Sequence, residues 1–442
     1  MNRYFIILIG LFSVFSYGQE VVGDFTDKSP ASELSNSWPS ELGLDSLFIH
    51  SKVDSIINEG IRQNAFPGAQ LLVAKEGKII FHEAYGFHTY DSVQAVALND
   101  IYDLASVTKI AGPLPAIMKL VDEGKLDLDA PFSNYWKSWR GRKDKKDLTL
   151  REILAHQAGL EPYIVFLNKV MKRDRLKKRF IQETKSNRFQ RQAYDGIYVK
   201  NKFQNKMHRI IRRSDVSADK KYRYSGLTFL IFPELIEQLT DIPYEKYLRE
   251  TFYDPLGCRT MGFNPDKWQV TNKIVPTEID TVFRKSLTQG WVHDENASLL
   301  GGVSGNAGLF ATAADLAKLM QLYQNYGSFN EQIYITENTL KEFTAVQYSE
   351  NDNRRGLGFD KPLLNNSELA ISEAYPAPKS SADSFGHSGF TGTFVWADPK
   401  NQLVFIFLSN RVYPSRSNRK LYSLNIRTAL HQVFYTAKSR QN

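Results

Sequence analysis

Cysteine is almost absent from this chain. Cys258 is the one cysteine among 442 residues, so no disulfide can form within the chain. Its context, Pro255-Leu256-Gly257, favours a small buried residue over a reactive nucleophile. No cysteine lies near the end of the N-terminal apolar run, so the sequence offers no lipid-attachment site there. The chain also lacks internal repeats, which excludes repeat architectures.

The first residues have the pattern of a secretory signal peptide. Met1-Asn2-Arg3 carries one positive charge, Tyr4 to Tyr17 is almost entirely apolar, and Gly18 is a small residue at the end of the run. The run is short for a membrane span, and an uncleaved anchor is the alternative. We expect a signal peptide over 1–18 and a disordered leader over 19–43. The mature protein is expected to be periplasmic or secreted, with no membrane span.

Positive charge is concentrated in one segment. The chain has a net charge of +8, but residues 161–221 hold 18 Lys/Arg and 6 Asp/Glu and carry +12, which leaves −4 for the remainder. Aromatic residues are interleaved with these charges, which is compatible with a nucleic-acid surface or with a lid over a substrate. We favour a lid or rim and expect no nucleic-acid partner. Salt-dependent binding of arbitrary DNA would contradict this expectation.

Periodicity predicts helices that flank a sheet. Helical spacing of apolar residues covers 44–64, 148–160, 227–239, 312–326 and 421–434, and the run after Ser106 reaches Val121. Strand patterns cover 69–74 and 79–86 as a hairpin, and 385–399 and 402–409 as two adjacent strands. A helix followed by an antiparallel hairpin and further helices indicates a sheet flanked by helices.

The strongest chemical signal is Ser106-Val107-Thr108-Lys109. On a helix, a spacing of three residues places the serine hydroxyl and the lysine amine on one face, where the amine can take the proton of the hydroxyl. Ser217 with Lys220 and Ser417 with Lys420 repeat the pattern, but only in polar surroundings. The apolar helix behind Ser106 therefore distinguishes it as the candidate nucleophile.

Two later motifs follow in a fixed order: Tyr224-Ser225-Gly226, and His387-Ser388-Gly389 at the start of a strand. Together with Ser106-x-x-Lys109, they resemble the serine β-lactamase and penicillin-binding-protein superfamily, specifically its class C-like serine hydrolases. The resemblance extends over about 45–435. It implies an α/β fold of the α+β type, with an antiparallel sheet flanked by helices and a mostly helical subdomain. The domain would span 44–437, with 161–221 as a basic insertion.

The resemblance also implies roles. Ser106 would attack a carbonyl and form an acyl-enzyme, with Lys109 and Tyr224 moving the proton. His387, Ser388 and Gly389 would line the substrate, and the amides of Ser106 and Phe390 would form the oxyanion hole. The implied function is an exported serine hydrolase acting on an ester or amide, such as an esterase, a D-amino-acid peptidase or a β-lactamase relative. No cofactor or metal is implied. The substrate would be a small molecule, or a peptide or ester, and one candidate source of it is the cell wall.

Two positions depart from the family pattern. Gly226 stands where Asn or Asp is usual, and Asn306 stands where a related loop often has His. An impaired protein that binds peptidoglycan fragments is therefore the alternative function. His387 in place of lysine favours esterase, peptidase or amidase relatives over dedicated β-lactamases.

The alternative interpretation is that the motif residues have purely structural roles. Ser106 would then begin a helix, Lys109 would lie on the surface, Tyr224 would pack in the core and His387 would brace a strand. His156 is expected to make a structural hydrogen bond, with general base as the alternative. The run His293-Asp294-Glu295 lacks a second cluster at metal-ligand spacing, so a loop-bracing role is expected.

Overall fold

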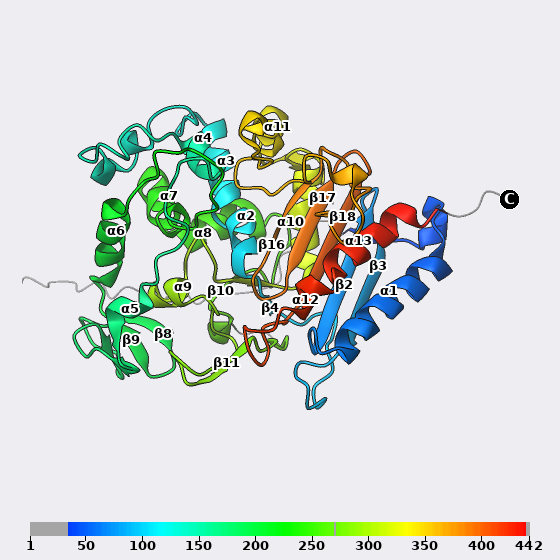
Figure 1. Cartoon of the computed structure of the whole chain (residues 1–442), viewed down its shortest axis with the longest axis horizontal. Coiled ribbons are helices and arrows are strands. Elements are labelled where there is room, and N and C mark those ends of the chain that lie inside the picture. The colour runs from blue at the N-terminus through cyan, green and yellow to red at the C-terminus, as the bar shows by residue number, and fades with distance from the viewer. Residues whose placement is uncertain (1–33, 269–270, 439–442) are drawn as a thin grey trace, which may run out of the picture.

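A computed structural model describes residues 34–268 and 271–438 of the chain (Figure 1). The predicted signal peptide over 1–18 and the first part of the predicted leader lie outside the described residues. The rest of the leader has regular structure: β1 (Ser35–Asn36) and η1 (Pro39–Leu42). The expectation of disorder up to residue 43 is wrong there, because β1 pairs with the exposed start of a sheet strand.

One six-stranded sheet joins the two ends of the chain. Its strand order is β1-β3-β2-β18-β17-β16, and all neighbours are antiparallel except β1 and β3, which are parallel. Gly77, with a φ of +71°, allows the tight turn between the first two long strands. The long strands are β2 (Gly68–Lys75), β3 (Lys78–Gly86), β16 (Phe385–Ser388), β17 (Phe394–Asp398) and β18 (Leu403–Ser409).

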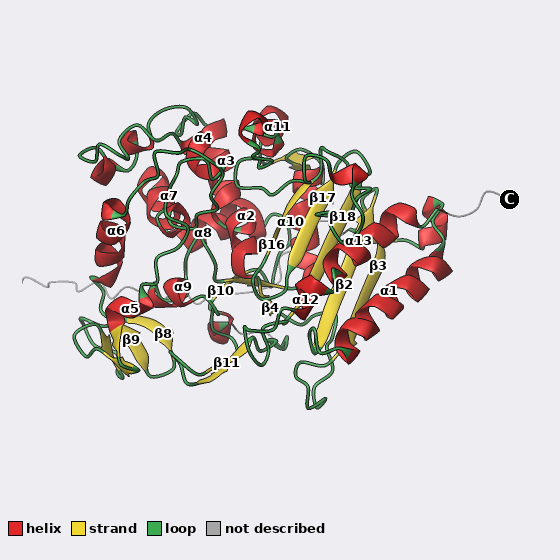
Figure 2. Cartoon of the chain, in the orientation of Figure 1, coloured by secondary structure: helices red, strands yellow, loops and turns green. Residues whose placement is uncertain are grey.

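Both faces of this sheet are covered. In β18, Phe405 and Phe407 pack with the cluster under α1 (Ser46–Arg62) and α13 (Ile426–Thr436), whereas Val404 and Ile406 pack on the opposite side. That opposite side contacts α10 (Ala313–Gln324), as the neighbouring ribbons in Figures 1 and 2 show. A strand buried on both faces explains why 402–409 is a nearly continuous apolar run.

The predicted helix from Ser106 to Val121 is interrupted. The structure divides it into η2 (Ala105–Val107), α2 (Thr108–Ala111) and α3 (Pro113–Asp122), with a break at Gly112. Pro113 and Pro115 lack the amide hydrogen that a continuous helix would use. The break lets a short turn carry the Ser-x-x-Lys motif, while α3 passes into the helical half of the molecule.

The helical half surrounds α3 (Figure 2). Thr149 and Glu152 form a capping box at the start of α4 (Leu150–Leu154), and Thr312 caps α10. The predicted helix over 148–160 stops early, because His156 adopts a φ of +57°. Further elements are α4 (Leu150–Leu154), η5 (Thr228–Leu230), α7 (Phe232–Thr240), α8 (Tyr244–Leu248), η6 (Arg249–Tyr253), α9 (Glu295–Leu299), β13 (Leu309–Ala311), α11 (Glu337–Thr344) and α12 (Lys420–Ser423).

The predicted strand over 385–399 is two strands. β16 ends at Ser388, a turn follows, and β17 begins at Phe394 and runs antiparallel to β16. Gly392, with a φ of +121°, lies in this turn. The residues on both sides of the turn are apolar, so the sequence alone suggests one continuous strand. Only the conformation of the glycine-containing turn divides it into two.

The basic segment 161–221 forms a small outlying unit. It contains α5 (Leu167–Val170), the hairpin β5 (Met171–Lys172) with β6 (Arg175–Leu176), and α6 (Phe203–Arg213). A separate three-stranded sheet has the order β7-β9-β8, formed by β7 (Ile181–Gln182), β8 (Arg191–Tyr194) and β9 (Ile197–Val199). Within residues 34–268 and 271–438, no helix has the length and apolar character to cross a bilayer.

Buried histidines make the fold acid-sensitive. Burial lowers the pKa of His431, on α13, to about 3, so the folded protein keeps this ring neutral while the unfolded chain protonates it near 6.5. Stability contributed by the neutral ring is therefore lost as the pH falls from about 6.5 towards 3. For one such histidine, the loss between pH 7 and pH 5 is about 2 kcal/mol.

Between pH 7 and pH 5, we expect the free energy of unfolding to fall by about 2 kcal/mol less in His431→Gln than in the parent protein, as measured by urea unfolding. Tyr435→Phe is the matched control, because it removes the hydroxyl 3.2 Å from His431 Nε2 and leaves the ring. The control should keep the full acid loss. An identical loss in His431→Gln would contradict the prediction.

Candidate active site

Ser106 and Lys109 meet as the sequence predicts. Lys109 Nζ lies 3.1 Å from Ser106 Oγ and donates a second hydrogen bond, of 2.9 Å, to the carbonyl of Asn306. The lysine is only 2% exposed, whereas Ser106 is half-buried and reaches the surface. The amine is thus held against the hydroxyl by a neighbouring backbone oxygen.

The backbone before Ser106 is in an unusual conformation. Ala105 has a φ of +46°, which side chains other than glycine rarely adopt. The buried carboxylate of Asp103 accepts hydrogen bonds from the amides of Ala105, at 2.8 Å, and His293, at 2.7 Å. Burial raises the pKa of Asp103, and these two amides oppose that shift. Strained backbone held by a buried group is typical of functional sites.

The turn between β16 and β17 is fastened to this backbone. Thr391 Oγ1 donates to the carbonyl of Asp103 at 2.8 Å, and Thr393 Oγ1 donates to the carbonyl of Leu104 at 3.0 Å. Arg411 Nε donates to the carbonyl of Phe390 at 2.8 Å, which fixes the orientation of that residue. Residues 388–390, which the sequence predicts to line the substrate, therefore lie beside the segment that carries Ser106.

Tyr224 lies among rings and cations. Its ring centroid is 5.4 Å from Lys109 Nζ, 4.6 Å from the His156 ring and 6.1 Å from the His387 ring. Its hydroxyl is buried and makes no hydrogen bond to any of the described residues. The structure thus brings Tyr224 together with Lys109 and His387, as the motif order predicts.

His387 is a neutral ring in the folded protein. Burial, with the positive charges of Arg355 and Lys109, lowers its pKa to about 3. Its Nδ1 lies 2.7 Å from the carbonyl of Ser388, so Nδ1 carries the proton and Nε2 is the acceptor. His387 therefore offers the site no positive charge at neutral pH.

Arg355 is not among the residues predicted from the sequence. It is 2% exposed, and its Nη2 lies 3.4 Å from His387 Nε2, while its Nη1 lies 3.1 Å from Asp360. Burial disfavours the charged form of Asp360, but Arg355 and Arg354 hold the pKa of this carboxyl below its usual range. No motif surrounds Arg355, and only the folded chain brings it to Tyr224.

Gly226 leaves open space beside Lys109. A Cβ placed on Gly226 would lie 3.9 Å from Lys109 Cε and 4.0 Å from Asn306 Cβ, which are ordinary contacts. The carbonyl of Asn306 already accepts from Lys109, and Asn306 Nδ2 donates to Asp294 at 3.1 Å. Both departures from the family pattern therefore lie side by side around the lysine.

The other candidate residues have structural roles. His156 Nδ1 accepts from the amide of Ser225, and burial, then Arg355 and Lys109, hold its pKa well below 6.5. His293 pairs with Glu278 at 2.9 Å, and Asp294 caps α9. No cluster of metal-binding side chains occurs in the part of the chain that the structure describes. Cys258 is buried, and its pKa is raised by burial.

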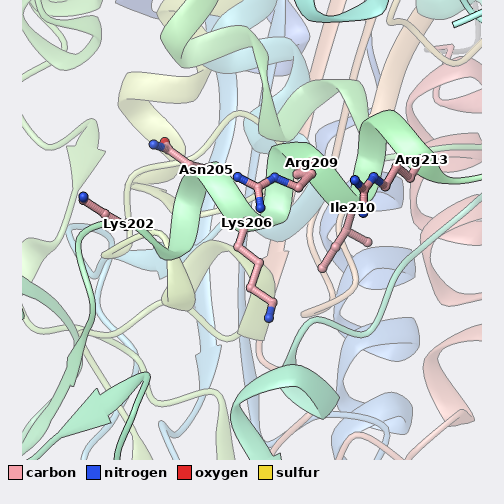
Figure 3. Close-up of a pocket in the computed structure, with 6 residues that line it drawn as sticks. All are labelled: Lys202, Asn205, Lys206, Arg209, Ile210 and Arg213. Carbon is pink, nitrogen blue, oxygen red and sulfur yellow. The ribbon is translucent and has the colours of Figure 1, made fainter.

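The beginning of the basic segment contacts the second motif. Ser225 Oγ donates to the carbonyl of Glu161, and the amide of Gly226 donates to the carbonyl of Pro162. By contrast, α6 lies at the outer edge of the helical half (Figure 1), where its side chains line a groove of about 340 Å³ (Figure 3). The groove is lined by Lys202, Asn205, Lys206, Arg209, Ile210 and Arg213. Part of the charge excess therefore lies on α6 at this outer edge.

Comparisons with known proteins cover most of the chain. The family profile described as Beta-lactamase matches residues 53–429. The chain belongs to the beta-lactamase family. A protein of Salmonella heidelberg (strain SL476), described as a candidate D-alanyl-D-alanine carboxypeptidase, is 30% identical over an alignment of 414 positions, and the match covers 88% of this chain and 88% of the relative.

Solved structures of the family have the same fold. The match to EstCE1, described as a hydrolase with promiscuous acyltransferase activity, has a TM-score of 0.64 at 17% identity and covers 87% of this chain and 99% of that one. A penicillin-binding protein homologue from Caulobacter crescentus gives 0.59 at 18% identity, with 87% and 97% covered. The predicted family and fold are confirmed, and the chain is a serine hydrolase.

Gly389 leaves no room for a side chain between the turn and the backbone that carries Ser106. A Cβ at Gly389 would lie 2.0 Å from Thr393 Oγ1 and 2.5 Å from the carbonyl of Leu104. We expect Gly389→Ala to slow covalent labelling of the protein by a fluorophosphonate about 100-fold, because the turn must move away from Ser106. Its stability should fall by only about 1–3 kcal/mol.

Gly141→Ala is the control, because a Cβ at Gly141 meets only Arg212 Nη2 at 3.7 Å. Parent-like labelling of this control is expected. If Gly389→Ala also labels at the parent rate, the contact between the turn and the Ser106 backbone does not shape the site.

Proposed function

We propose that Ser106 is the nucleophile, that Lys109 and Tyr224 move its proton, and that residues 387–390 receive the substrate. The observation that carries this proposal is the buried Lys109 amine, 3.1 Å from Ser106 Oγ and 5.4 Å from the Tyr224 ring. The proposed nucleophile Ser106, the proton carrier Lys109 and the second titratable group, Tyr224, thus lie next to one another, as covalent catalysis requires.

The reaction then proceeds in two halves. Ser106 Oγ bonds to the carbonyl carbon of an ester or amide, while its proton passes to Lys109 or Tyr224. The same groups return a proton to the leaving alcohol or amine as its bond to carbon breaks. The amides of Ser106 and Phe390 stabilise the negative oxygen of the intermediate, and Arg411 holds the Phe390 peptide in place. Water then attacks the acyl-enzyme by the same steps in reverse, which releases the carboxylic acid product and regenerates Ser106.

A peptide or ester with a D-amino acid is the proposed substrate class. Support comes from the 30% identical relatives described as candidate D-alanyl-D-alanine carboxypeptidases. His387 is neutral and places no fixed charge of its own at the strand edge, which suits neutral esters as well as peptides. We further propose that the protein is exported to the periplasm or outside the cell, on the pattern of 1–18, and that nucleic acid is not a partner.

Covalent labelling tests the proposal directly. The parent protein should form a one-to-one adduct with a fluorophosphonate and release D-alanine from a D-alanyl-D-alanine peptide. In Ser106→Ala, both activities should fall to background, because the attacking oxygen is gone. Adducts are measured by intact-protein mass spectrometry.

The serine of the second Ser-x-x-Lys match provides the control. Ser217→Ala should label at the parent rate, because its partner residue, Lys220, forms an ion pair with Glu152. A parent protein that never labels, or an adduct that persists in Ser106→Ala, would refute the assignment of the nucleophile.

Gly226 motivates a second candidate function, an impaired protein that binds peptidoglycan fragments. On that hypothesis, Gly226→Asn should create or sharply raise turnover by supplying the usual amide. On ours, the carbonyl of Asn306 already holds Lys109, so we expect Gly226→Asn to change kcat/KM by less than about threefold. Hydrolysis of the D-alanyl peptide, with Gly226→Ala as the steric control, separates the two. A gain of about 100-fold or more would favour the impaired protein.

A further inference from the structure

A phenol can act as a base near neutral pH only if positive charge next to it stabilises the phenolate. Around Tyr224, several groups that could provide such charge are neutral. Burial and neighbouring cations hold His156 and His387 in their neutral forms. Lys109 exchanges protons with Ser106 in the proposed reaction, so its charge changes as the reaction proceeds. The site therefore needs one cation that does not titrate.

Arg355 meets that requirement. Its Cζ lies over the Tyr224 ring, 5.5 Å from the ring centroid, so its positive charge is close to the aromatic system of the phenol. Arginine stays protonated throughout the range in which proteins function, so this charge is constant. Because the side chain is 2% exposed, water screens the charge little.

The position of the guanidinium is determined by two partners. Asp360 pairs with Nη1 at 3.1 Å, and the backbone of Asp360 is itself paired with Gly386, at the start of β16. Nη2 points to the unprotonated Nε2 of His387, at 3.4 Å. His387 thus acts as a neutral acceptor that aims Arg355 at Tyr224.

We propose that Arg355 is a positioning residue that supplies the fixed positive charge of this site and stabilises the Tyr224 phenolate. The inference rests on the proposed function, because it assigns a role to Tyr224 in that reaction. This role explains how the third motif can contain a neutral histidine, because Arg355, in the loop before β16, supplies the positive charge instead. In this proposal Arg355 acts through Tyr224.

The titratable groups that face Tyr224 or border it come from several elements and must be considered together. Lys109 faces it from α2, His156 from the end of α4 and His387 from β16, while Arg355 and Asp360 approach from the loop that precedes β16. On its own loop, Tyr222 lies two residues away, and Arg223 pairs with Glu161 at 3.3 Å. Arg355 is the buried arginine of this set.

The test measures the rate of fluorophosphonate labelling of Ser106 between pH 5 and pH 10. In Arg355→Gln, we expect the acid limb of the profile to move up by about one pH unit and the rate at pH 7 to fall about tenfold, with recovery towards pH 10. Arg355→Lys retains a charge and should move by less than about half a unit. Equal slowing of Arg355→Gln at every pH, or no change at all, would overturn the inference.

Arg223→Gln is the matched control, since it removes a cation one residue from Tyr224 that is half-exposed and already paired with Glu161. Its acid limb should coincide with that of the parent; an equal shift would contradict a specific role for Arg355. Arg354 still pairs with Asp360 at 2.8 Å when Arg355 is removed. If Arg355→Gln nevertheless fails to fold, Arg355→Gln with Asp360→Asn gives the same readout without an unpaired carboxylate.

The proposed function and the role of Arg355 can be refuted separately. A parent protein that does not label refutes the proposed function. A parent that labels, while Arg355→Gln keeps the parent profile, refutes only the role of Arg355.

Discussion

The hydrogen bond from Thr393 Oγ1 to the carbonyl of Leu104 links the last strands of the sheet to the segment that carries Ser106. Its neighbour from Thr391 reaches the carbonyl of Asp103, and Asp103 in turn holds the amide of Ala105 in a strained conformation. Buried polar groups are costly when unpaired, so these contacts favour one arrangement of the turn over any other. The relation of Ser106 to residues 387–390 depends on them.

Backbone atoms and distant side chains supply what the motifs omit. The carbonyl of Asn306 binds Lys109 where Gly226 offers no side chain, and Arg355 brings a charge next to the neutral His387. Both substitutes lie outside the motif positions that they support. A departure within a motif is therefore weak evidence against activity when a buried neighbour can provide the same hydrogen bond or charge.

Much of the fold could be predicted, because its signals are local. The hairpin of β2 and β3, the cap at Thr312 and the family pattern around Ser106 each depend on residues close in sequence. The breaks at Gly112 and after Ser388 were missed, although Pro113 and the glycines of the turn were available signals. Arg355 could not be predicted, since an arginine without a motif acquires its meaning only from tertiary packing.

The sheet brings together strands from opposite ends of the chain, and this affects the order of events during synthesis. Leu104 and its partner Thr393 are 289 positions apart, and β2 pairs with β18 across a similar separation. Such pairings close only after the intervening chain exists, and they fold slowly for that reason. A ribosome-bound chain that already contains Ser106 and Lys109 still lacks β16 to β18. The candidate site around Ser106 therefore stays incomplete until nearly the whole polypeptide has been made.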